Sequence, residues 1–390
     1  MHENAVFYTI FLIFAGAAVF STLVLYTRQS LLVAYILLGA AFGPWGLKLI
    51  TDLRAVQQVG EVGIVFLLFL LGLHLQPQNL IHMLKKVTWI AMLSSALFAL
   101  IAYLIGRWFG LSSTESWVLG AAMMFSSTII GLKLLPTTIL HHQHTGEVMI
   151  SVLLMQDLIA IIVLILINGG HQASGFSWHD LMLVGVALPA LIIFGFLVER
   201  LVLVKLLARF DRTQEYVFLL SIGWCLGMSV VAKNLGLSEE IGAFVAGVVL
   251  ASSPISLFIA ESLKPLRDFF LVMFFFSVGA TFNFGYAAQV VIPAVILAAL
   301  MLLIKPMCFK ILFVKSGEKK RVAQEVGLRL GQASEFSLLV ASIAMSTKLI
   351  SDVASNLIQA ATILTFIVSS YVVVLKYPTP MSLSDKMRKD

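Results

Sequence analysis

Two adjacent polar residues, Gln156 and Asp157, interrupt an apolar stretch at 151–167 that is long enough to cross a bilayer. A carboxylate at the centre of a bilayer costs about 2.5–3.5 kcal/mol on insertion scales. A chain keeps such a group where a partner, water or a cation stabilises it. We therefore expect Asp157 to bind a cation and a proton in turn, with Gln156 as its neighbour.

Two other apolar runs carry clusters of small and polar residues at their centres. The clusters are Ser126, Ser127 and Thr128 in one run, and Gln332, Ser334 and Glu335 in the other. Such residues suit two crossing, locally unwound helices whose freed carbonyl groups could hold a cation. We expect Ser127 and Thr128 to line the cation and proton site with Asp157. The alternative is that the hydroxyls bond back to their own helix or aid packing, and that Glu335 stabilises a helix end.

Lys305 is a cation inside another apolar run, at 289–313. A buried lysine in a membrane needs a partner or a route for its ammonium group to the interface. We expect Asp157 to be the charge partner of Lys305. The pair could be permanent and only fix helix packing, or an entering cation could displace the ammonium group.

The composition indicates a polytopic, all-α membrane protein. The mean hydropathy is +1.00, 60% of the residues are hydrophobic, and 12% are charged, against about 25% in soluble domains. The apolar runs are unbroken over roughly 17–25 residues, which predicts helices and excludes barrel strands. There is no phosphate-binding loop, dinucleotide fingerprint or nucleophile elbow. We expect no enzymatic activity, no cofactor and no nucleic-acid partner.

About thirteen membrane-spanning helices are predicted. They lie near 5–26, 31–49, 58–76, 87–109, 115–135, 147–168, 180–199, 214–233, 236–253, 266–282, 289–313, 323–346 and 353–375. Alternate connections on one side carry nineteen Lys and Arg residues, against five on the other side. The positive-inside rule makes the first side cytoplasmic. The N-terminus is then outside and the C-terminus inside.

An internal repeat relates the two halves of the chain. The stretch at 32–44 resembles 241–254, and the stretch at 66–72 resembles 273–279, with offsets of 210 and 207 residues. The same shift carries Ser126–Thr128 onto the cluster at 332–335. This shift moves each predicted span onto the seventh span after it. Because seven is odd, the two copies lie inverted in the membrane. Inverted repeats with interrupted helices are typical of secondary transporters.

These residues resemble the Kef-type members of the monovalent cation:proton antiporter superfamily. The resemblance covers nearly the whole chain, and its motifs are Val62-Gly-Ile-Val-Phe-Leu-Leu-Phe-Leu-Leu-Gly-Leu73, Leu154-Met-Gln-Asp157, Ile241-Gly-Ala-Phe-Val-Ala-Gly247, Phe274-Phe-Phe-Ser-Val-Gly279 and Leu330-Gly-Gln-Ala-Ser-Glu-Phe-Ser337. It implies a thirteen-helix homodimer of sodium/proton antiporter-like fold that moves its ion by an elevator-like shift. The Gln-Asp pair resembles the potassium-selective branch. The resemblance thus implies K⁺, or else Na⁺, bound at Asp157.

The same resemblance implies a division of labour along the chain. Scaffold and dimerisation helices would lie in 1–82 and 213–285, the transport core in 83–170 and 286–377, and a linker helix in 178–212. Residues 378–390 would form a short cytoplasmic tail without the regulatory domain that Kef-type proteins carry.

The expected function is therefore exchange of potassium for protons across the inner membrane of a bacterium. Sodium/proton exchange is the first alternative. A potassium channel and a membrane-embedded pH sensor that moves no ions are alternatives from other classes, although no stretch resembles a channel's carbonyl filter.

Overall fold

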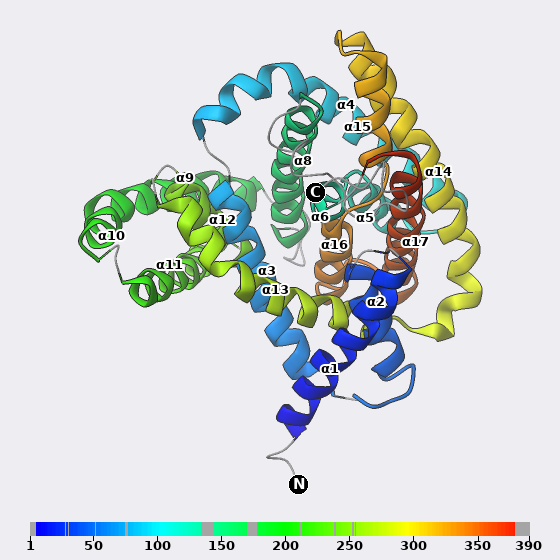
Figure 1. Cartoon of the computed structure of the whole chain (residues 1–390), viewed down its shortest axis with the longest axis horizontal. Coiled ribbons are helices and arrows are strands. Elements are labelled where there is room, and N and C mark those ends of the chain that lie inside the picture. Colours follow the sequence, from blue (N-terminus) through cyan, green and yellow to red (C-terminus); the bar gives the residue numbers. More distant parts are fainter. Residues whose placement is uncertain are drawn as a thin grey trace. The chain divides into compact units, whose positions relative to one another are not determined.

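A computed structural model describes residues 5–27, 29, 31–50, 52–74, 77–133, 144–169, 178–210, 213–237, 239–251, 253 and 255–378. All secondary structure in these residues is helical (Figure 1). Six helical stretches of this described part are long and apolar enough to cross a membrane. The predicted all-α polytopic fold is confirmed. Of the predicted tail at 378–390, the structure describes only Pro378.

The helices fall on the predicted spans, although two begin ten residues before the predicted start, at Pro77 and Ser256, and one ends seven residues early, at Phe42. They are α1 (Ala5–Tyr26), α2 (Leu31–Phe42), α3 (Arg54–His74), α4 (Pro77–Trp108), α5 (Ser113–Met123), α6 (Thr128–Lys133), α8 (His144–Gly169), α9 (Trp178–Val198), η1 (Glu199–Leu203), α10 (Val204–Phe210), α11 (Gln214–Asn234), α12 (Glu239–Leu250), α13 (Ser256–Thr281), η2 (Phe284–Tyr286), α14 (Ala287–Lys315), α15 (Lys320–Arg329), α16 (Glu335–Ser346) and α17 (Asp352–Lys376). Two predicted spans are interrupted, one between α5 and α6 and the other between α15 and α16. These are the two runs whose polar centres predicted a break.

The internal repeat is visible in where the helices begin. Helices α5 and α15 begin 207 residues apart, at Ser113 and Lys320, and α6 and α16 begin 207 residues apart, at Thr128 and Glu335. This is the offset that the sequence motifs predict. At α5 and α16, short polar residues precede the first turn because their side chains form hydrogen bonds with its free backbone N–H groups. Ser112 and Glu115 form a capping box at α5, and the Ser334 hydroxyl accepts from the Phe336 backbone N–H at α16.

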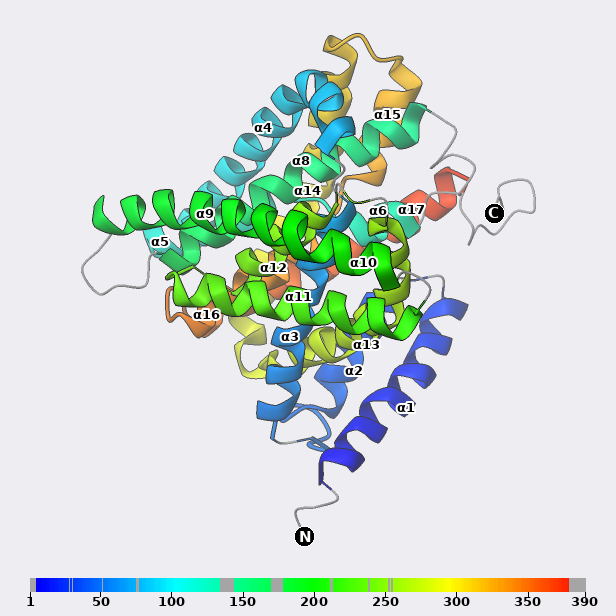
Figure 2. The same cartoon turned by 90° about the vertical axis from the view of Figure 1, so that its left-hand side faces the viewer.

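The chain divides into two compact units. One unit comprises Met1–Thr51, Met83–Leu164 and Val278–Asp390, and the other comprises Asp52–His82 and Ile165–Ser277. The second unit has an apolar core in which α3 packs on α12 and α11 packs on α12 (Figure 2). The first unit contains both interrupted helices, together with α14 and α17, which pack on each other. The predicted division into scaffold, core and linker stays a prediction.

Glycines allow repeat-related helices to cross closely. A methyl group on Gly120 would lie 2.7 Å from the Ala99 carbonyl oxygen, where α5 meets α4. A methyl group on Gly327 would lie 2.7 Å from the Pro306 carbonyl oxygen, where α15 meets α14. Both members of the second pair are 207 residues beyond those of the first. Small residues at these crossings bring each broken helix against its neighbour's backbone.

Candidate functional site

The two helix breaks are buried and lie within one unit of the structure. Residues 124–127 separate α5 from α6, and residues 330–334 separate α15 from α16. Ser126, Ser127, Gln332 and Ser334 are each at most 1% exposed. An unwound backbone at membrane depth must find hydrogen-bond partners inside the protein. The side chains that supply these partners define the candidate site.

Gln156 supports the first break. The Ser126 backbone N–H donates to Gln156 Oε1 at 3.1 Å, and Gln156 Nε2 donates to the Met124 carbonyl oxygen at 3.3 Å. Both ends of the amide are therefore engaged with the unwound backbone. Gln156 precedes Asp157 on α8. These hydrogen bonds therefore keep this turn of α8, with the Asp157 backbone, close to the first break.

Thr365 supports the second break in the same manner. The Ala333 backbone N–H donates to the Thr365 hydroxyl at 3.0 Å, and this hydroxyl donates to the Thr362 carbonyl oxygen at 2.8 Å. Ala333 is the repeat equivalent of Ser126, 207 residues further on. A residue of α17 thus does for the second break what Gln156 of α8 does for the first.

Serine hydroxyl groups join the two broken helices directly, and Gln332 Nε2 donates to the Ser127 carbonyl oxygen at 3.5 Å. The Ser126 hydroxyl donates to the Leu330 carbonyl oxygen at 2.8 Å, and the Ser337 hydroxyl donates to the Ala122 carbonyl oxygen at 2.5 Å. The Ser127 hydroxyl donates to Glu335 Oε2 at 2.6 Å. The Ser127 oxygen also accepts from the Ile130 backbone N–H at 3.0 Å, which caps the start of α6. The predicted crossing of two unwound helices is confirmed. The hydroxyl groups of Ser126, Ser127 and Ser337 bond one broken helix to the other.

Lys305 lies fully buried where the two breaks meet. Its ammonium group donates to the Phe125 carbonyl oxygen at 2.5 Å and to the Gln332 carbonyl oxygen at 3.1 Å. It also lies 5.2 Å from the centre of the Phe98 ring, close enough for a cation–π interaction. Phe125 and Gln332 are repeat equivalents, as are Phe98 and Lys305, each pair 207 residues apart. Lys305 therefore takes matching carbonyl groups from both halves of the chain.

The positive charge of Lys305 suits this position. The freed carbonyl groups follow α5 and α15, whose C-terminal ends carry partial negative charge. The described partners of Lys305 are thus backbone oxygens and an aromatic ring. The Asp157 side chain lies outside the described part of the structure, so the expected pair between Asp157 and Lys305 stays a prediction.

The structure brings most of the predicted site residues together. Gln156, Ser126, Ser127, Lys305, Gln332 and Glu335 meet at the crossing through the contacts above. Thr128 begins α6 and is half-buried, and Ser334 caps α16. Asp157 follows Gln156 on α8. In the described residues, no group of three or more His, Cys, Asp and Glu side chains is arranged to hold a metal ion.

The contribution of α17 to the site was not predicted from the sequence. Thr365 supports the second break, and the Ser369 hydroxyl donates to Gln332 Oε1 at 2.9 Å. A signal was present, because Ser355, Gln359, Thr362 and Ser369 recur at helical spacing in the last apolar run and are all buried. A buried polar stripe on a membrane helix indicates contact with other polar groups.

The comparisons with known proteins agree with this architecture. Residues 10–375 match the family described as the transmembrane sodium/hydrogen exchangers. The iron transporter MagA of Paramagnetospirillum magneticum is 27% identical over 345 residues, which are 88% of this chain and 79% of MagA. The structure is similar to that of the sodium proton antiporter MjNhaP1 from Methanocaldococcus jannaschii, with a TM-score of 0.72 and 17% identity, over 98% of this chain and 97% of that one.

The family match extends over nearly the whole chain, and the fold is similar to that of MjNhaP1 over almost its full length. The chain therefore belongs to the family of transmembrane sodium/hydrogen exchangers, which are multi-pass membrane proteins that exchange cations for protons.

Proposed function

We propose that this protein exchanges potassium ions for protons, with Asp157 binding each in turn. The observation that carries the proposal is the engagement of Gln156, whose amide is held by the Ser126 N–H and the Met124 carbonyl oxygen. The Gln156 amide carries no charge, and its oxygen and nitrogen already form hydrogen bonds with backbone groups. Asp157 is then the carboxylate that this part of α8 contributes to the ion site.

One carboxylate favours an exchange of one monovalent cation for one proton. Either occupant neutralises the Asp157 charge, so the membrane-embedded site stays neutral in both loaded states and avoids the cost of an uncompensated charge. Lys305 keeps its ammonium group on two backbone oxygens. The cycle therefore moves no net charge.

Potassium as the cation rests on the resemblance of the Gln156–Asp157 pair to the potassium-selective Kef branch. Sodium is the alternative because of the family match, and because the structurally similar MjNhaP1 is called a sodium proton antiporter. The name of the relative MagA adds iron as a cation to be included in the assay.

The proposed movement is an elevator-like shift of the transport core. Hydrogen bonds join the two breaks to α8, α14 and α17 inside one compact unit. Elements tied in this way are suited to move as one body that carries Asp157 from one side to the other. The proposed setting is a bacterial inner membrane, and the proposed working form is a homodimer.

Proton flux in reconstituted liposomes tests the proposal. The vesicles contain a pH-sensitive dye and carry an outward or inward gradient of K⁺, Na⁺ or Fe²⁺. The variants are Asp157→Asn and, as a matched control, Asp268→Asn, which changes an exposed carboxylate paired with Arg267. We expect potassium to drive rapid proton movement in the wild type and in Asp268→Asn, and none in Asp157→Asn.

Each other result has a definite meaning. A larger proton flux with sodium or iron than with potassium would show that sodium or iron, and not potassium, is the transported cation. Exchange that persists in Asp157→Asn would show that Asp157 does not carry the cation and the proton. Proton movement that appears only after a protonophore is added indicates a potassium channel, because a channel moves potassium and its charge without coupling to protons.

A further inference from the structure

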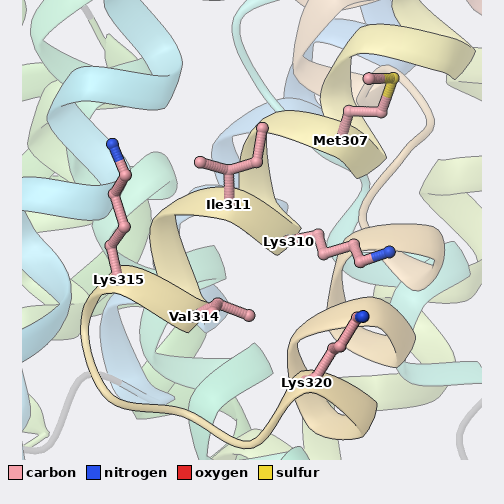
Figure 3. A pocket seen from close by; sticks show the side chains of 6 residues that line it. All are labelled: Met307, Lys310, Ile311, Val314, Lys315 and Lys320. Carbon is pink, nitrogen blue, oxygen red and sulfur yellow. The ribbon is translucent and has the colours of Figure 1, made fainter.

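An open groove lies between the end of α14 and the start of α15. It has a volume of about 470 Å³ and is lined by Met307, Lys310, Ile311, Val314, Lys315 and Lys320 (Figure 3). All six residues belong to one compact unit. Helices α14 and α15 pack on each other beside it, so the walls come from a well-defined helical hairpin.

The floor of the groove is apolar and exposed. Met307, Ile311 and Val314 are 61%, 50% and 42% exposed and follow one another along the same face of α14. Phe284–Lys315, the stretch that includes α14, is apolar enough to cross a membrane. Apolar side chains on the surface of such a helix are covered by lipid hydrocarbon. The floor therefore fits an acyl chain.

The rim of the groove is basic. Lys310, Lys315 and Lys320 line it, and no carboxylate is among the six lining side chains. The turn that joins the two helices adds Lys319 and one acidic residue, Glu318, and the first turn of α15 adds Arg321. Figure 3 shows the ammonium groups of Lys310 and Lys320 on one side of the groove and that of Lys315 on the other. Lysines at the end of a membrane helix extend their ammonium groups toward the headgroup layer.

We propose that this groove binds an anionic phospholipid. The phosphate contacts Lys310 and Lys320, and one acyl chain lies along Met307, Ile311 and Val314. Basic pockets between membrane helices on the cytoplasmic side bind acidic lipid headgroups by the same combination of charge and depth. A soluble anion would satisfy the lysines but would leave the apolar floor uncovered, so the lipid fits both parts of the groove.

The position of the groove relates the lipid to the helix crossing. Helix α14 carries both the groove and Lys305, and α15 leads from the groove to the second break. A lipid bound here contacts the end of α14 and the start of α15. The inference is independent of the cation that the protein transports.

Native mass spectrometry of the purified protein in detergent tests the inference, with phosphatidylglycerol as the probe. The test variant is Lys310→Gln with Lys320→Gln. The matched control is Lys205→Gln with Lys376→Gln, which removes two exposed lysines from other places on the same predicted side. A lysine near an anionic headgroup contributes about fivefold in affinity. We expect the test variant to bind phosphatidylglycerol at least tenfold more weakly and the control to bind like the wild type.

Two further arms identify the ligand. Phosphatidylcholine, which has the same chains and no net charge, is expected to bind poorly. Glycerol 3-phosphate, which has the phosphate without the chains, is expected not to displace phosphatidylglycerol. Equal binding by the test variant, or displacement by glycerol 3-phosphate, would overturn the proposal.

Discussion

At the scale of single residues, Lys305 is the most constrained group of the site. Its ammonium group bonds two carbonyl oxygens at repeat-equivalent positions, Phe125 and Gln332, and lies over the Phe98 ring. Those carbonyl groups come from unwound segments, where the helical partners of the backbone are missing. Lys305 thus acts as a tethered cation that joins the halves of the chain.

We predict that Lys305→Met destabilises the protein by about 2 kcal/mol. The change leaves the Phe125 and Gln332 carbonyl oxygens without this donor, and an unsatisfied buried acceptor costs about 1–3 kcal/mol. Removal of a buried charge offsets part of this loss. Thermal unfolding in detergent measures the effect, with Lys376→Met as an exposed control. A variant as stable as the control would show that the ammonium group does not hold the two breaks together.

At the scale of elements, the broken helices depend on close contact with their neighbours. Gly120 of α5 faces the Ala99 backbone, and Gly327 of α15 faces the Pro306 backbone, at matching positions of the repeat. In both cases the nearest atom is a backbone carbonyl oxygen, which cannot rotate away as a side chain can. The helix axes must therefore separate to admit a larger residue.

We predict that Gly120→Ala and Gly327→Ala each destabilise the protein by about 1–3 kcal/mol, because overpacking moves backbone segments. The two effects are expected to be similar in size because the crossings are equivalent. Gly227→Ala on α11 is the control, since a methyl group there meets nothing within 4 Å and favours the helix. Unfolding curves of the three variants decide the matter. If the two crossing variants match the control, these crossings are not tightly packed.

At the scale of the whole molecule, the two halves of the chain are also tied at a second place. The Glu115 carboxylate accepts from the Ser112 N–H at 2.9 Å, and from the Ser351 N–H and hydroxyl at 3.1 and 2.5 Å. These bonds link the start of α5 to the start of α17, although 236 residues separate Glu115 from Ser351. This tie and the helix crossing both lie within one compact unit.

We predict that Glu115→Ala destabilises the protein by about 0.5–2 kcal/mol, because it removes the reciprocal cap of α5 and the acceptor of the exposed Ser351 N–H and hydroxyl. Glu261→Ala is the control, since this glutamate is exposed and pairs with Lys264 on the same helix. The same unfolding assay compares the two variants. Equal stability would contradict a role of Glu115 in joining α5 to α17.

The predicted orientation can be tested with single cysteines in a chain whose buried Cys225 and Cys308 are replaced by alanine. We expect Lys319→Cys to react with an impermeant maleimide only in inside-out vesicles, and Lys348→Cys only in right-side-out vesicles. The reason is the excess of Lys and Arg on one set of connections. The opposite labelling pattern would reverse the topology. Labelling of both sites from one side would contradict the predicted number of spans between them.

The sequence by itself determined the features that depend on local composition and periodicity. Apolar runs predict membrane helices, and small polar residues inside them predict the breaks at Ser126–Thr128 and at Gln332–Glu335. The offset of 207 residues recurs in the helix starts at Ser113 and Lys320. These signals are local because bilayer thickness and backbone hydrogen bonding constrain each helix separately.

Only the tertiary structure decided which groups meet. Lys305 bonds backbone carbonyl oxygens, and every residue has such an oxygen, so no sequence pattern reveals this choice. Thr365 supports the second break because α17 lies against it, whereas the equivalent support at the first break is an amide, Gln156. The repeat places an unpaired backbone N–H at the same position of both breaks, and a different side chain accepts from it in each half of the chain. Contacts between distant segments follow from packing, which sequence spacing alone does not specify.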